Sequence, residues 1–126
     1  MRRLALILFI FCSNAYSQCW EVGDLKGVSA KEGSKYEVSK DGISKNTFKI
    51  NIAGKNSSVT PSSDLKCMQL ATHSLTCLYS ENGKGTTETW SVDPENYVAY
   101  YTKTNSGYGM FDGAALFVGT IKGSCN

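Results

Sequence analysis

Apolar and polar residues alternate along most of the chain. In segment 47–53, for example, Phe48, Ile50 and Ile52 alternate with polar neighbours. A period of two residues predicts β-strands that turn one face toward a core. The pattern predicts strands over residues 20–28, 34–39, 47–53, 57–60, 65–70, 75–80, 86–93, 96–104 and 114–122.

Short runs of turn-forming residues separate the predicted strands. These runs contain glycine, asparagine, aspartate or proline at 40–42, 53–56, 81–85 and 93–96. Connections this short join strands that pair antiparallel. Segment 29–35 has room for one helical turn. The expected architecture is a small antiparallel β-barrel or sandwich of about eight to nine short strands.

The first residues have the three-part pattern of a secretory signal peptide. Two arginines precede an apolar run over 4–11, and Ala15 and Ser17 are small residues before the expected cleavage site. This run is shorter than the roughly 20 residues that cross a bilayer, and a buried N-terminal strand is the alternative. We expect residues 1–17 to be a cleaved signal peptide and residues 18–126 to be a single all-β domain. The product would be periplasmic or secreted, without a membrane anchor.

Charge narrows the range of partners. The whole chain has a formal net charge of +2, and both arginines lie in the expected signal peptide. The remaining domain has 11 lysines and 11 acidic residues. A neutral domain without arginine lacks the residue that most often contacts phosphates and guanine bases. We therefore expect no nucleic-acid partner, and we expect the domain to be a monomer.

Four cysteines remain after the expected cleavage: Cys19, Cys67, Cys77 and Cys125. An even number of cysteines in a small exported domain indicates disulfides, and three pairings are possible. We favour Cys19–Cys125, which would tie the first strand to the last, and Cys67–Cys77, which would close one hairpin. Zinc is the alternative, but the cysteine spacing is not that of a metal knuckle and only one histidine is present.

That histidine, His73, lies on an expected turn. A cysteine–histidine pair needs a free thiol, and a serine nucleophile needs a histidine base together with an acid. Segment 107–113 is rich in glycine but lacks the spacing of a P-loop or dinucleotide fingerprint. We therefore expect no catalytic residue, no metal and no cofactor, and a binding protein rather than an enzyme.

A carboxylate pair, as in glycoside hydrolases, is a further catalytic possibility. The candidates at expected turns or on a polar strand face are Glu81, Glu88, Asp93 and Glu95. Glu88 also alternates in phase with Trp90 and Val92. Because acids and lysines balance, we expect these carboxylates to be ordinary solvated surface.

The connection between the last two predicted strands is long for a hairpin and is not simply polar. Hairpin loops usually have about two to five residues, whereas segment 104–113 has three glycines, two aromatics and a methionine. Aromatic side chains are common at interface hot spots. We predict a partner-binding site made of Ser106, Gly107, Tyr108, Met110, Phe111 and Asp112. In the alternative, Met110 and Phe111 fold back and cap the open end of the barrel.

One family motif can be compared with this loop. Periplasmic lysozyme inhibitors are small β-barrels with a Ser-Gly-x-x-Tyr loop, and Ser106 and Gly107 match its first two positions. Met110 stands where that motif has tyrosine. Two common residues cover almost none of the chain, so the match assigns no family and does not favour lysozyme as a target.

These observations favour an exported protein-binding domain that inhibits or neutralises an enzyme. Examples are an immunity protein against a delivered toxin and an inhibitor of a lytic enzyme of the cell wall. The alternative is a lipocalin-like carrier for a small ligand. Its binding cavity would be lined by Tyr36, Phe48, Trp90, Tyr97, Tyr100, Tyr101 and Phe117. A second alternative is a secreted effector enzyme that uses a carboxylate pair.

Overall fold

The computed structural model describes residues 17–61 and 64–125, and these form an all-β fold. The expected signal peptide falls almost wholly on residues 1–16, which lie outside the described residues. The strands are β1 (Gln18–Lys31), β2 (Ser39–Ile43), β3 (Phe48–Ile52), β4 (Ser58–Thr60), β5 (Lys66–Ala71), β6 (Ser74–Glu81), β7 (Lys84–Asp93), β8 (Val98–Ser106) and β9 (Gly113–Ser124). Three short 3-10 helices lie in the connections: η1 (Glu32–Ser34), η2 (Gly54–Asn56) and η3 (Gly109–Phe111).

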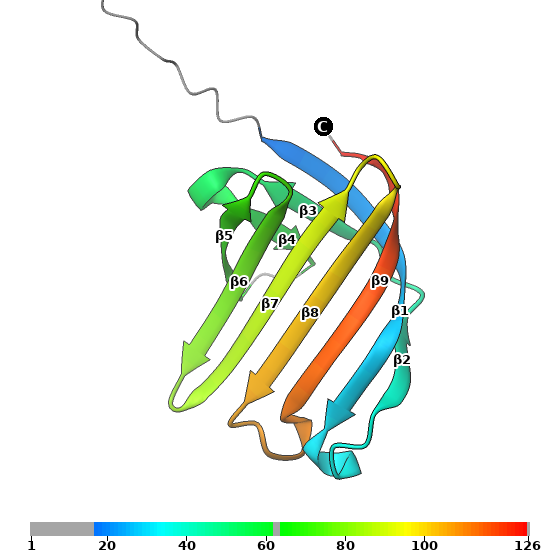
Figure 1. Ribbon diagram of the computed structural model, residues 1–126. Coiled ribbons are helices and arrows are strands. Elements are labelled where there is room, and N and C mark those ends of the chain that lie inside the picture. The colour runs from blue at the N-terminus through cyan, green and yellow to red at the C-terminus, as the bar shows by residue number, and fades with distance from the viewer. Residues whose placement is uncertain (1–16, 62–63, 126) are drawn as a thin grey trace, which may run out of the picture.

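The strands form one antiparallel sheet that curls into a nearly closed barrel (Figure 1). Its order is β4-β3-β1-β9-β8-β7-β6-β5, and β2 pairs with the second half of β1. The outermost strands β4 and β5 contact each other without pairing. The predicted antiparallel β-fold is therefore confirmed as a barrel rather than a sandwich, and the predicted pairing of the first and last strands is also confirmed.

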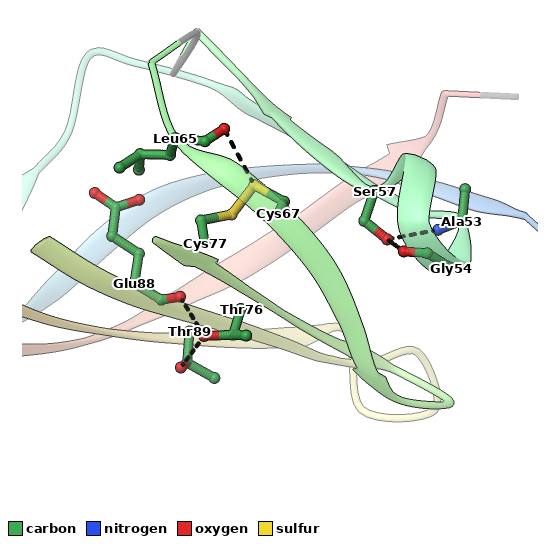
Figure 2. Close-up of a disulfide and its surroundings, with 9 residues drawn as sticks. All are labelled: Ala53, Gly54, Ser57, Leu65, Cys67, Thr76, Cys77, Glu88 and Thr89. Carbon is green, nitrogen blue, oxygen red and sulfur yellow. Dashed lines mark hydrogen bonds between the residues drawn. A yellow bond between two sulfur atoms is a disulfide. The ribbon is translucent and has the colours of Figure 1, made fainter. Parts of the chain in front are cut away.

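Both predicted disulfides are present. Cys19–Cys125 joins residues 106 positions apart, and the Cys125 amide also donates to the Cys19 carbonyl at 2.9 Å. Cys67–Cys77 links directly paired residues of β5 and β6, with a Cα–Cα distance of 4.0 Å (Figure 2). Because all four thiols are oxidised, the zinc alternative is wrong. Disulfides persist in oxidising environments, so the protein belongs to a compartment outside the cytoplasm.

The core combines aliphatic side chains with a stack of aromatic rings. Trp90 lies between Phe48 and Tyr101, with ring centroids 5.1 and 4.1 Å away, and Tyr101 stacks on Phe117 at 5.6 Å. Buried aliphatic residues surround this stack: Val22, Leu25, Ile50, Ile52, Val59, Leu75, Val92, Ala99 and Ile121. Because side chains alternate between the two faces of a strand, the rings from the neighbouring strands β7, β8 and β9 all point to the inward face, where they stack.

One predicted strand and one predicted turn are wrong. Segment 34–39 is mostly not extended, because Lys35 and Tyr36 have φ values of 54° and 59° in the left-handed region. The expected turn at 40–42 is instead part of β2. Tyr36 is exposed, so a short apolar alternation here reflects surface residues rather than a core face.

Candidate binding site at one end of the barrel

The connection between β8 and β9 is shorter than the sequence suggested. The two strands extend to Ser106 and Gly113, which leaves residues 107–112 as the connection; we call these six residues the rim loop. Gly107 has a φ of 87°, and a Cβ atom there would lie 2.5 Å from the Gly83 carbonyl oxygen. The rim loop therefore packs closely on the β6–β7 turn, and only glycine allows this approach.

Asp112 organises the rim loop. Its carboxylate accepts hydrogen bonds from the amides of Gly107, at 3.0 Å, and Tyr108, at 2.6 Å. Its amide donates to the Gly109 carbonyl at 2.9 Å, and its carbonyl accepts from the Glu32 amide at 2.8 Å. The Asp112 carboxylate therefore fixes the conformation of its own loop, and the Asp112 backbone carbonyl links this loop to η1.

The apolar side chains of the rim loop project into solvent. Met110 and Phe111 each expose 61% of their surface, although Met110 also touches Gly33 of η1. Tyr108 is half-buried, and the Lys84 ammonium lies 5.9 Å from its ring centroid. Ser106 is exposed at the end of β8. The six predicted site residues are therefore adjacent, and Met110 and Phe111 are its most exposed apolar members.

A pocket of about 200 Å³ opens beside the rim loop; we call it the mouth pocket. Its floor is apolar, whereas its walls carry charged and amide side chains. The lining residues are Lys31, Asp41, Ile43, Tyr101, Lys103, Asn105, Phe111, Gly113, Ala114, Ala115 and Phe117. Phe111 is the residue that the mouth pocket shares with the predicted loop site.

Strand register explains why this part of the barrel is hollow. On the inward face, Tyr101 of β8 pairs with Phe117 of β9, and both rings fill the space. At the next inward position of β9, Ala115 pairs with Lys103, and after that Gly113 pairs with Asn105. The small residues of β9 thus leave room that the long side chains of β8 line but do not fill.

The mouth pocket borders a buried carboxylate. Glu88 is only 6% exposed, and the Lys103 ammonium lies 3.5 Å from its Oε1 atom. Burial raises the pKa of Tyr101, and the negative charge of Glu88 and a hydrogen bond to it raise that pKa further. The side chain of Glu88 is on the same face as Cys77, with which it pairs across β6 and β7 (Figure 2). The expectation that Glu88 is solvated surface is therefore wrong.

The sequence contained a signal for these inward polar residues. Glu88 shares the phase of Trp90, and Lys103 and Asn105 share the phase of Tyr101. The overall balance of acids and lysines does not place each single acid at the surface, and the phase of Glu88 indicates that it is inside. Lys31 and Asp41 had no comparable signal, since Lys31 extends β1 beyond its predicted end and Asp41 lay on an expected turn.

Other candidate chemistry is sparse in the parts of the chain that the structure describes. The His73 ring contacts the Gln18 side chain at 3.0 Å and is exposed. Within residues 17–61 and 64–125, no group of three or more His, Cys, Asp and Glu side chains is placed to hold a metal ion. The same residues contain no helix with the length and hydrophobicity needed to cross a membrane.

The chain was also compared with known proteins. No protein-family model, no curated protein and no solved structure matches the chain.

Proposed function

We propose that this chain is an exported protein-binding domain that blocks an enzyme by inserting its rim loop into a cleft on that enzyme. The periplasm is the proposed location, and a delivered toxin or a lytic enzyme of the cell wall is the proposed type of target. The observation that carries the proposal is the exposure of Met110 and Phe111 on a loop that Asp112 holds in one conformation.

Preorganisation is what makes this exposure useful for binding. Ordering a flexible loop on association costs free energy, and a loop that is already fixed avoids most of that cost. The hydrogen bonds of Asp112 and the close contact of Gly107 with Gly83 fix the rim loop before any partner arrives. Large apolar side chains on such a loop can then enter a partner's pocket with little entropic penalty.

The position of the rim loop also suits insertion. η3 lies beside η1 at one end of the barrel, away from the end where β1 begins and β9 finishes (Figure 1). A loop at the end of a rigid barrel is accessible from several directions, and binding residues often lie on such loops. Tyr36 is a further exposed aromatic residue, two positions after the end of η1.

The two alternatives receive less support. A carrier for an apolar ligand needs an open interior, but four of its seven proposed lining residues form the packed aromatic stack, and Tyr36, Tyr97 and Tyr100 are exposed. An effector enzyme would need two carboxylates that act together, whereas the buried Glu88 is paired with Lys103.

Differential capture tests the proposal. The wild-type protein, the double variant Met110→Asp/Phe111→Asp and the control Leu70→Asp are immobilised and exposed to periplasmic extract and culture supernatant. Leu70 on β5 is 66% exposed, so its replacement by aspartate adds a negative charge to the surface outside the rim loop. Thermal melts first establish that all three proteins are folded.

We expect mass spectrometry to identify an enzyme captured by the wild type and by Leu70→Asp but not by the double variant. The purified wild-type protein should then inhibit that enzyme at a molar ratio near one. Equal capture by the double variant would remove the rim loop from the proposal. Capture without inhibition would contradict its role as a blocking protein.

A further inference from the structure

The mouth pocket has hydrogen-bond donors that the protein itself does not use. Among the described residues, the Lys31 ammonium has no side-chain partner, and the Lys103 ammonium has a single one, Glu88 at 3.5 Å. A lysine ammonium has three N–H donors, so several remain free at the pocket wall. The Asn105 side-chain NH2 group donates only over a long 3.5 Å contact to the Phe111 carbonyl, whereas the Asn105 side-chain oxygen accepts from the Thr86 hydroxyl at 2.8 Å.

The acidic groups near the pocket are more fully engaged than the lysines. One oxygen of Asp41 accepts the Gly42 amide at 2.8 Å, and Glu88 lies against Lys103 and the Tyr101 hydroxyl. The mouth pocket therefore offers free donors at its wall and an apolar floor formed by Tyr101 and Phe117. A ligand that matches both features has an acceptor-rich anionic group and a flat apolar part.

We propose that the mouth pocket binds a small carboxylate carried on a ring or a short apolar stem. The apolar part would stack on the floor of the pocket, and the carboxylate would meet the ammonium groups of Lys31 and Lys103. The volume of about 200 Å³ is below the range of drug-sized sites, which begins near 300 Å³, and suits a group the size of one ring. This inference does not depend on the rim loop binding a protein.

Such a carboxylate can come from two sources. A free organic acid can diffuse into the pocket, or an acidic side chain of a bound protein can enter it. Both present the same group to the same lysines, so one set of variants tests the site and a separate comparison of ligands distinguishes the sources.

Phenylacetate is the first probe, and phenethylamine is its matched cation with the same ring. Each is titrated into the ¹⁵N-labelled, fully oxidised protein, and amide chemical shifts are followed by NMR. We expect phenylacetate to bind with a Kd of about 1–10 mM, as its ten non-hydrogen atoms allow, and to shift the amides of Asn105, Gly113 and Ala115. Phenethylamine should bind at least about tenfold more weakly, because it meets ammonium groups.

Filling the pocket tests its location. Ala115→Leu places a larger side chain in the hollow, and we expect phenylacetate affinity to fall at least about tenfold. Thr102→Leu is the control, because Thr102 lies on the outer face of β8 beside Lys103 and its replacement leaves the hollow unchanged. NMR spectra of both variants show whether the barrel remains folded.

Two charge variants of the pocket wall should change the affinity for phenylacetate in opposite directions. Lys31→Met should weaken phenylacetate binding about threefold, whereas Lys26→Met, on the outward face of the same strand, should leave it unchanged. Asp41→Asn removes a negative charge from the pocket wall and should strengthen binding by a similar factor. These small changes are within the precision of an NMR titration.

The acetylated and amidated tripeptide Ala-Glu-Ala distinguishes the two sources. Tighter binding of phenylacetate indicates a free acid as the natural occupant, and tighter binding of the peptide indicates a protein side chain. The proposal is overturned if phenylacetate does not bind up to about 50 mM, which is well above the expected range. It is also overturned if phenethylamine binds equally well, or if folded Ala115→Leu binds phenylacetate as tightly as the wild type.

Discussion

The same strands line both halves of the barrel interior, but their inward side chains are apolar in one half and largely polar in the other. Toward one end, β7 and β8 contribute Val92, Trp90, Ala99 and Tyr101, which are buried in contact with one another. We call this the packed half. Toward the rim loop, the next inward residues of the same strands are polar: Glu88, Thr86, Lys103 and Asn105. We call this the open half.

The contrast separates the part of the molecule that stabilises the fold from the part that is free to bind. In the packed half, large side chains fill the interior, and each buried side chain contributes about 1.5–3 kcal/mol relative to exposure. In the open half, Ala115 and Gly113 face long polar side chains, so space and hydrogen-bonding groups remain. A barrel of this size can leave its mouth open because the packed half already provides a core.

The largest single loss of stability that we expect concerns the two disulfides. Cys19–Cys125 closes nearly the whole domain, whereas Cys67–Cys77 joins residues only 10 positions apart in one hairpin. Cys77 also pairs with Glu88 across β6 and β7. In the chain-entropy model, losing the first lowers the free energy of unfolding by about 4–5 kcal/mol and losing the second by about 3 kcal/mol.

Urea denaturation of Cys19→Ala/Cys125→Ala and of Cys67→Ala/Cys77→Ala measures both effects. The two variants remove equal numbers of sulfur atoms, so each serves as the control for the other. A larger loss from the hairpin disulfide would mean that local packing, rather than loop closure, determines these contributions.

A core residue and a rim residue give the next comparison. Trp90 in the packed half is 1% exposed, and Trp90→Ala should lower the free energy of unfolding by about 3–5 kcal/mol because it leaves a cavity within the aromatic stack. Phe111→Ala in the rim loop should cost at most about 1 kcal/mol, since most of that ring is in solvent.

Chemical denaturation of the two variants, compared with the wild type, tests this difference. A loss of about 3 kcal/mol for Phe111→Ala would favour the alternative in which Phe111 caps the barrel. The same measurement on Tyr108→Ala shows whether its contact with Lys84 adds to the stability of the loop.

The packed half was largely predictable from the sequence. Period-two alternation over β3, β7, β8 and β9 places apolar side chains on one face, and that face is the core. The even cysteine count indicates disulfides, and the expected pairing of the first and last strands favours Cys19–Cys125 among the three possible pairings. The prediction of a strand over residues 34–39 is wrong because Lys35 and Tyr36 have left-handed backbone conformations. The short apolar alternation there looks the same in the sequence as that of a real strand.

The open half was less predictable because its function depends on three-dimensional neighbours. The alternation along β7 places Glu88 on the inward face. A buried carboxylate needs a partner, however, and that partner, Lys103, lies on the neighbouring strand β8, where the sequence alone does not reveal it. Asp112 was expected to face a partner, and sequence alone does not show that its carboxylate accepts two amides of its own loop. The mouth pocket arises from the pairing of Ala115 with Lys103, which requires the register.

Tyr101 lies at the boundary of the two halves and gives the smallest expected effect. Its ring stacks on Trp90, while its hydroxyl interacts with Glu88, and its pKa is raised above the ordinary value of 10.0, first by burial and then by that carboxylate. The unfolded chain ionises Tyr101 near pH 10, but the folded protein keeps it protonated. Its contribution to stability is therefore fully present below pH 10 and falls as the pH rises above that value.

Between pH 9 and pH 11, this group should lower the wild-type free energy of unfolding by about 1.4 kcal/mol, because each pH unit above the unfolded pKa corresponds to about 1.4 kcal/mol. Tyr101→Phe removes the ionisable hydroxyl and should reduce the alkaline slope by that amount, whatever its effect on stability at neutral pH. Urea denaturation of both proteins at pH 9, 10 and 11 gives the two slopes. Identical slopes would mean that Tyr101 ionises as readily in the folded barrel as in the unfolded chain, and that the buried carboxylate of the open half does not act on the ring stack of the packed half.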